Sequence, residues 1–178
     1  MNNIKYFSQF ILISILFMIF KLIGLKYSSI LSGRIFTVIG PIFRSNKICY
    51  SNLSKALPKL SLRQKKEIIK NMWNNYGKIL AEYVFIKNFR ISENFSKNII
   101  IENQEELDSI KKNPDPVIFI SGHFNNFELM AMHIEKSGID LAAIYRPLNN
   151  RFLNPLMENI RKKYICKKQI KKGISGTK

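Results

Sequence analysis

A histidine and a carboxylate lie close together in the second half of this chain. Four residues separate His123 from Glu128, and both follow an apolar run at 116–120. A histidine in such a position can take a proton from a hydroxyl group, and a nearby carboxylate can hold the imidazole in the tautomer whose free nitrogen accepts that proton. The two side chains are therefore suited to acyl transfer onto a hydroxyl.

The apolar run at 116–120 predicts a strand. It is rich in β-branched residues and lies between Pro114 and Gly122. A short apolar run with such boundaries is typical of a strand that is covered on both faces. His123 is then expected in the loop at the carboxyl end of this strand, where ligand chemistry gathers in open α/β sheets.

A helix is expected directly after His123. Asn125 and Glu128 match a capping box, and apolar residues recur at helical spacing until Gly138. Glu128 in the first turn could lean back toward His123, and the amides at the helix start favour the negative charge of an oxyanion. The same spacing also fits a structural interpretation, in which Glu128 only caps the helix and His123 is an ordinary loop residue.

A second strand is predicted at 140–145. With the helix between them, the strands at 116–120 and 140–145 predict a βαβ unit with parallel strands and a right-handed crossover. Arg146 then emerges at the same sheet edge as His123, where its guanidinium suits a phosphate or carboxylate. A surface ion pair is an equally good interpretation of Arg146 from the residues alone.

Two further amphipathic helices are predicted, one on each side of this unit. Ser61 with Gln64 forms a capping box, and a second helix follows Phe152 until Tyr164. The first helix carries an aromatic-rich apolar stripe that favours core packing over an acyl-chain groove: Ile69, Met72, Trp73, Tyr76, Leu80 and Tyr83.

The amino-terminal residues predict a membrane anchor at 1–26. Residues 6–20 are almost entirely apolar, and the apolar stretch continues to Leu25 past Lys21. A membrane span needs about 20 such residues, so the stretch is long enough if Lys21 reaches the headgroups. A secretory signal peptide is the alternative, but no small-residue cleavage site follows, which favours a retained anchor.

The charge of the chain favours a membrane partner. The net charge is +17, and the first 66 residues contain 11 basic residues and no acidic one. By the positive-inside rule the polypeptide that follows the anchor is expected to stay in the cytoplasm, and a basic surface is attracted to anionic lipid headgroups. Nucleic acid is disfavoured as a partner, because the aromatic residues lie on apolar helix faces rather than among basic residues.

The remaining residues that could bind a metal or take part in a reaction predict little. Cys49 and Cys166 are too few and too widely separated for a zinc site, so no metal site is expected. His133 is predicted to be a solvent-facing residue in the middle of a helix. The ten basic residues in 140–178 predict a solvated face that could also attract lipid phosphates or an acidic carrier protein.

Four blocks carry a resemblance to a known family. They lie at 52–58, 75–83, 121–129 and 143–148. In this order they resemble segments of the lipid A biosynthesis acyltransferases, the lauroyl and myristoyl transferases within the glycerolipid acyltransferase group. The block that contains His123 resembles the family's Gly-His-Phe-Gly-Asn-Trp-Glu sequence.

The chain departs from that block at two positions. Asn125 stands where the family has glycine, and Phe127 stands where it has tryptophan. Phenylalanine keeps an aromatic packing residue. Asparagine adds a Cβ where the backbone could need a positive φ, a conformation that asparagine tolerates better than most residues.

The resemblance implies an α/β fold, with an anchor helix at 1–26 followed by a glycerolipid-acyltransferase-like domain at 27–178. It implies transfer of a fatty acyl chain from an acyl carrier protein thioester to a hydroxyl of a Kdo-lipid A precursor. His123 would be the general base, Glu128 would orient and stabilise the imidazolium, and Arg146 would bind an anionic part of a substrate. No cofactor is required, because the thioester is already activated.

Two alternatives remain open. A lysophospholipid acyltransferase would use the same chemistry, although such enzymes usually carry aspartate where this chain has Glu128. Members of the resembled family also continue with further strands, so the domain is expected to be incomplete at its carboxyl end. The chain would then be a truncated product, or a non-catalytic membrane-bound remnant.

Overall fold

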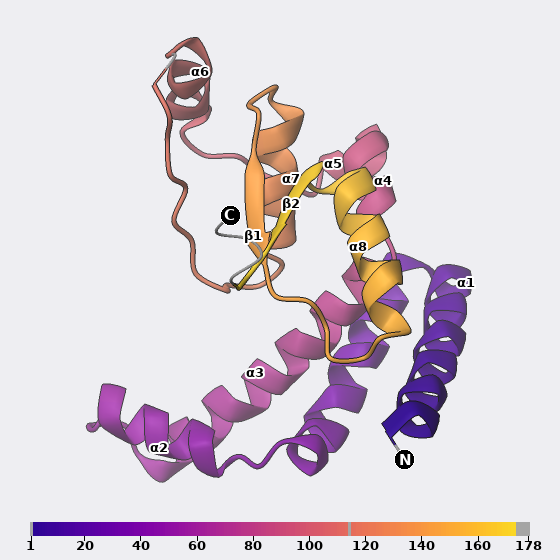
Figure 1. Cartoon of the computed structure of the whole chain (residues 1–178). Coiled ribbons are helices and arrows are strands. Elements are labelled where there is room, and N and C mark those ends of the chain that lie inside the picture. Colours follow the sequence, from indigo (N-terminus) through magenta and orange to yellow (C-terminus); the bar gives the residue numbers. More distant parts are fainter. Residues whose placement is uncertain (1, 114, 174–178) are drawn as a thin grey trace. The chain divides into compact units, whose positions relative to one another are not determined.

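The computed structural model describes residues 2–113 and 115–173, which are mostly helical with a small parallel sheet (Figure 1). The elements in chain order are α1 (Asn2–Phe43), α2 (Lys47–Ala56), α3 (Leu62–Tyr83), α4 (Ile86–Ile91), α5 (Glu93–Ser96), α6 (Gln104–Lys112), α7 (Glu128–Lys136), β1 (Ala142–Tyr145), α8 (Leu153–Tyr164) and β2 (Lys168–Lys171). The chain divides into two compact units, one of Phe17–Val84 and one of Met1–Leu16 with Phe85–Lys178. The expected division at residue 26 stays a prediction.

The long helix α1 has the length and composition of a membrane span. Its apolar stretch, Asn3–Ile42, contains an 18-residue window with a mean hydropathy of 2.1, and only 6% of that window is buried within the chain. The helix is broken at Gly24, whose φ of 76° and ψ of 168° are not helical. One long apolar helix near the amino terminus is compatible with the expected membrane anchor.

In the unit of residues 17–84, α3 packs closely on the second part of α1. A Cβ placed on Gly77 would lie 2.3 Å from the backbone oxygen of Ser32, and one on Gly40 would lie 2.2 Å from the Trp73 ring. The indole nitrogen of Trp73 donates a hydrogen bond of 2.9 Å to Asn46. Glycine at the two contact positions therefore allows the helices to approach each other.

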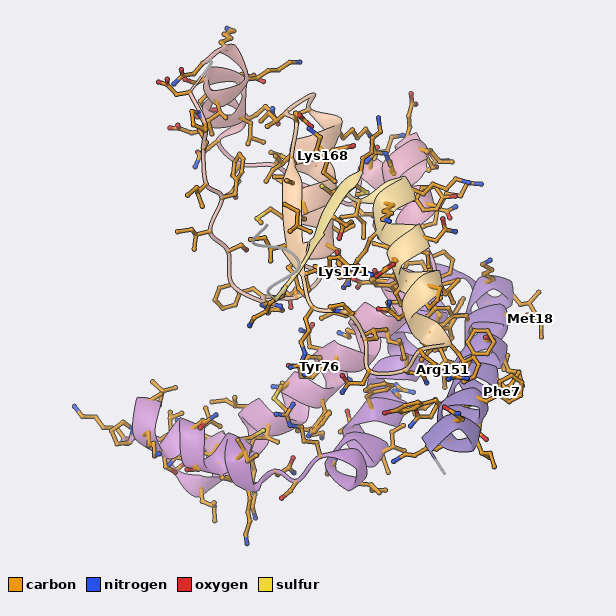
Figure 2. All side chains as sticks on the ribbon, viewed as in Figure 1. Phe7, Met18, Tyr76, Arg151, Lys168 and Lys171 are labelled. Atoms are coloured by element: carbon orange, nitrogen blue, oxygen red, sulfur yellow. The ribbon has the colours of Figure 1, made fainter. Side chains whose placement is uncertain are left out.

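The sequence-based expectations for α3 are largely confirmed. Ser61 forms the predicted capping box with Gln64. Ile69, Trp73 and Tyr83 of the apolar stripe are buried, which confirms the core interpretation for these three positions. Tyr76 is exposed and is labelled on α3 in Figure 2.

In the second unit, β1 and β2 form a two-stranded parallel sheet. The register pairs Ala142 with Lys168 and Tyr145 with Lys171, and α8 connects the two strands. β1 confirms the strand predicted at 140–145, and α8 confirms the helix predicted after Phe152. The sequence analysis did not predict β2.

The strand predicted at 116–120 is wrong. These residues belong to no helix or strand, and Ile118 and Ile120 are 86% and 92% exposed. The parallel pair is therefore β1 with β2, and not 116–120 with 140–145. Apolar, β-branched composition favours a pleated surface but does not select a pairing partner, which is a tertiary choice. Pro114, expected at the start of this strand, lies outside the described residues.

The described residues contain a smaller sheet than the expected α/β domain. The sheet has two strands, and most of the remaining chain is helical. The expectation that the domain stops short of further strands depends partly on 174–178, which lie outside the described residues, and it stays a prediction.

Candidate functional site

The loop between 116–120 and α7 carries the histidine, His123, and the carboxylate of Glu128 is at the first residue of α7. Asn125 has a φ of 46°, which confirms the sequence-based expectation of a positive φ there. The prediction that Asn125 caps the helix is wrong, because α7 begins at Glu128 after Phe127 and has no side-chain cap. A left-handed residue cannot be the extended N-cap that a capping box requires. α7 ends at Lys136, and Gly138 follows with a φ of 90°, as the sequence predicted.

His123 is exposed in this loop. Its ring packs against Phe127, with ring centroids 4.3 Å apart and planes tilted by 54°. Within the described parts of the chain, His123 makes no hydrogen bond and no ion pair. Its ring nitrogens therefore face solvent and are accessible to a proton donor.

Glu128 is buried and forms an ion pair with Arg161 of α8. Its Oε1 accepts hydrogen bonds from Nε of Arg161 at 2.8 Å and from Nη2 at 2.6 Å. The side chains of Glu128 and Arg161 are 9% and 17% exposed. Hydrogen bonds between two charged groups are among the strongest in proteins. The structure thus joins Glu128 to Arg161, and the expected interaction of Glu128 with His123 stays a prediction.

A second polar contact lies beside this ion pair, at the carboxyl end of β1. The hydroxyl of Tyr145 donates to Glu158 of α8, and the Arg161 guanidinium lies 5.8 Å from the Tyr145 ring centroid. Glu158 also accepts a hydrogen bond of 3.1 Å from Asn154. We call Glu128, Tyr145, Glu158 and Arg161 the α8 polar cluster. It ties the start of α7 and the end of β1 to one helix.

Lys171 extends this network to the second strand. Its Nζ lies 3.4 Å from Oε1 of Glu158, and Figure 2 shows its side chain between β2 and α8. Burial, followed by the hydrogen bond to Glu158, raises the pKa of Tyr145 to about 12. The hydrogen bond from Tyr145 is in turn the main cause that lowers the pKa of Glu158. At neutral pH the cluster therefore holds a neutral phenol next to an ionised carboxylate.

Arg146 follows the last residue of β1 and is exposed. It forms no ion pair with any other described residue, and no described contact joins it to His123 or Glu128. The sequence prediction of a surface ion pair is therefore not realised in this part of the chain. The Arg146 guanidinium is free to bind an anion, and its chain neighbour Tyr145 belongs to the α8 polar cluster.

The sequence analysis missed Glu158 and Arg161. They are three residues apart on α8, so they share one face of that helix. Two opposite charges one helical turn apart on an amphipathic helix were the available signal. Their partners lie 13 and 33 residues away, which local spacing does not reveal.

His133, expected to face solvent, is instead half-buried at the other end of α7. Its Nε2 lies 3.0 Å from the Gln104 side-chain oxygen, and it lines a cavity of about 320 Å³ together with Lys136 and Ser137. Burial, and then the charge of Lys136, lowers the pKa of His133 below 6.5. The fold therefore favours the neutral imidazole.

This lowered pKa predicts a loss of stability in acid. Below pH 6.5 the unfolded chain takes up a proton at His133 that the folded chain resists, so stability falls as the pH drops through that value. His133→Gln should flatten this part of the profile. Urea unfolding of both proteins in mild detergent, at several pH values from 7.5 to 5, measures the difference. Parallel profiles would contradict the assignment.

A comparison with protein families gives one match. A family model described as "Bacterial lipid A biosynthesis acyltransferase" matches residues 1–172. No curated protein and no solved structure matches the chain. The matched range contains His123, Glu128, Arg146 and the α8 polar cluster.

Proposed function

Because this chain belongs to the bacterial lipid A biosynthesis acyltransferase family, we propose that it moves a fatty acyl chain from an acyl carrier protein thioester to a hydroxyl of a Kdo-lipid A precursor. Membership of the family confirms the resemblance seen in the four sequence blocks. It identifies an acyltransferase of lipid A biosynthesis. The carrier-protein donor and the Kdo-bearing acceptor are the finer parts of the proposal.

His123 is proposed as the general base. Its exposed imidazole has no hydrogen-bond partner among the described residues, so a ring nitrogen can accept the proton of the acceptor hydroxyl. As that proton leaves, the hydroxyl oxygen attacks the thioester carbonyl and forms the new ester bond. The carbon–sulfur bond then breaks, and the imidazolium returns the proton to the departing thiolate.

Glu128 is proposed to orient and stabilise the imidazolium from the first turn of α7. Its carboxylate is buried and held by two hydrogen bonds from Arg161, so its position is set by α8. His123 would have to approach the start of α7 for this role. The amides at the start of the helix would then lie near the carbonyl oxygen that becomes negative.

Arg146 is proposed to bind an anionic group of a substrate. It is exposed and has no ion-pair partner among the described residues, and its guanidinium can contact two oxygens of a phosphate or carboxylate. The net charge of +17 supports an acidic carrier protein and anionic lipids as partners. α1 supports attachment to the inner membrane, with the body on the cytoplasmic face.

An acceptor assay tests this function. The 178-residue chain in detergent is incubated with a fatty acyl thioester of acyl carrier protein and with either a Kdo-lipid A precursor or a lysophospholipid. The products are then identified by mass spectrometry. We expect an added acyl chain on the lipid A precursor alone. If only the lysophospholipid gained an acyl chain, the acceptor would be a lysophospholipid and not the lipid A precursor. A chain that binds liposomes but acylates neither acceptor would be the non-catalytic remnant.

A further inference from the structure

The first part of α1, residues 2–23, carries an exposed apolar stripe. Its members recur three or four residues apart, so they share one face of the helix. Six side chains form it, and all six are exposed: Ile4, Phe7, Ile11, Ile15, Met18 and Leu22. Phe7 and Met18 are labelled in Figure 2. The stripe is about 27 Å long at the rise of an α-helix. An exposed apolar surface of this length indicates that something covers it.

The opposite face of this helix is bonded to the residues that precede α8. The side-chain amide of Asn150 donates hydrogen bonds to the backbone oxygen of Tyr6 at 2.9 Å and to Oε1 of Gln9 at 3.2 Å. The ring of Phe152 packs against that of Phe10, with centroids 6.4 Å apart. Asn150 itself is buried. The start of α1 is therefore fixed to the residues around Asn150, within one compact unit.

This contact bears on the side of a membrane at which α1 begins. A single span would separate the two ends of the helix by about 30 Å of hydrocarbon. The residues around Asn150 lead into the charged helix α8, which cannot lie within the hydrocarbon. The amino end of α1 thus lies on the same face as the body. Its carboxyl end also leads into the body, through α2 and α3. A single crossing by α1 is incompatible with these connections.

The second part of α1, residues 25–43, is not a return span. It follows the break at Gly24 and packs on α3, where a Cβ on Gly77 would lie 2.3 Å from the backbone oxygen of Ser32. Seven of the 22 residues of α3 are charged, and α3 would have to enter the hydrocarbon beside such a span. Arg34, near the middle of this part, is exposed. Charged side chains in the middle of a bilayer are costly.

We propose that α1 attaches the chain to a membrane without crossing it, with residues 4–22 lying in the plane of the bilayer surface and the apolar stripe inserted into the leaflet next to the body. Lys5 and Lys21 lie on opposite sides of the stripe, where their ammonium groups reach the lipid phosphates. The partner is thus the surface of an anionic bilayer, which is the surface that in-plane helices with basic flanks bind. This mode of attachment does not depend on acyl transfer.

A second copy of the chain is the rival cover for the stripe. Two stripes packed together would bring together two amino-terminal regions, each with 11 basic residues and no acidic one in its first 66 residues. Like charges across an interface repel each other. Anionic headgroups attract the same lysines, by about fivefold in affinity for each well-placed one. Charge complementarity therefore favours a lipid surface.

Spin-label depth measurements in vesicles of phosphatidylglycerol and phosphatidylcholine test the orientation. Ile4→Cys, Ile11→Cys and Leu22→Cys are made one at a time in a Cys49→Ser background, where the other cysteine, Cys166, is fully buried. All three labels should lie about 5–10 Å below the headgroups, at nearly equal depths. A label at Ile11 near the bilayer centre, with those at Ile4 and Leu22 at opposite surfaces, would overturn the proposal. Labels that avoid lipid would overturn it as well, in favour of a second copy.

Glu105→Cys in the same background is the matched control. Glu105 is exposed in the acidic first turn of α6, so a label there should stay in water. A label at Glu105 as deep as the label at Ile11 would remove the distinction between α1 and the body, and would also overturn the proposal. Unchanged helix content in circular dichroism shows that each labelled chain is folded.

A membrane-impermeant maleimide tests the crossing itself in spheroplasts of the expressing bacterium. Asn3→Cys and Lys26→Cys place a cysteine beyond each end of the stripe, and the native Cys49 of α2 is the reference for the body. None of the three should react until the spheroplasts are opened. Reaction of Asn3→Cys in closed spheroplasts would show a single span, and reaction of Lys26→Cys would show a hairpin that crosses twice. Either result would overturn the proposal. Neither measurement uses acyl transfer, so failure here leaves the proposed function to its own assay.

Discussion

Replacing His123 by alanine is expected to lower the rate of acyl transfer by about 10²- to 10⁴-fold, the usual contribution of a general base. The substitution removes the only proposed acceptor for the hydroxyl proton. It should not disturb the fold, because His123 is exposed and makes no hydrogen bond or ion pair with a described residue. The expected change is therefore in kcat, with the KM for the thioester donor almost unchanged.

The other histidine of the chain supplies the matched control. His133 also belongs to this region, but it lies at the far end of α7 and bonds to Gln104. His133→Gln keeps a polar side chain there and should transfer acyl groups at nearly the wild-type rate at pH 7.5. Turnover by His123→Ala at the wild-type rate would end the role proposed for His123.

The helices were the part of the fold that the sequence predicted best, because their signals are local. The capping box of Ser61 and Gln64 joins residues three apart, and it forms as expected. The same pattern failed at Asn125, because the positive φ of that residue removes it from the N-cap position. A capping box therefore predicts a helix start only where the backbone of the first residue is extended.

The strands could not be predicted in the same way. The apolar run at 116–120 is unpaired in the structure, whereas β2 has the sequence Lys-Gln-Ile-Lys with a single apolar residue. β2 forms because α8 returns the chain beside β1, where Ile170 pairs with Ile144. Strand pairing is thus decided by tertiary contacts, and composition alone misplaces it.

The candidate site was predicted only in part for the same reason. His123 and Arg146 are prominent in the sequence, and both are exposed in the structure. The partner of Glu128 was not found, because Arg161 is 33 residues away and reaches Glu128 only after α8 has packed. Local spacing suggested His123 as a partner of Glu128, which stays a prediction, and it gave no sign of the ion pair with Arg161.

Replacing Arg161 by methionine is therefore expected to have the largest effect on stability. The change removes two charge-assisted hydrogen bonds from the buried carboxylate of Glu128. Breaking one side of a buried ion pair typically costs about 3–5 kcal/mol, because the remaining charge stays in a poorly solvated place. Urea unfolding in mild detergent should show a correspondingly lower midpoint. Hydrogen exchange should show that the amides of α7 and β1 lose protection at the lowest urea concentrations.

Two comparisons separate this ion pair from a general effect of lost charge. Lys171→Met breaks the contact with Glu158, but the Lys171 side chain is 56% exposed, so the cost should stay below about 1 kcal/mol. Combining Arg161→Met with Glu128→Met removes both charges and should recover much of the lost stability. A double variant as unstable as the sum of its single variants would show that Arg161 stabilises this region through contacts other than Glu128.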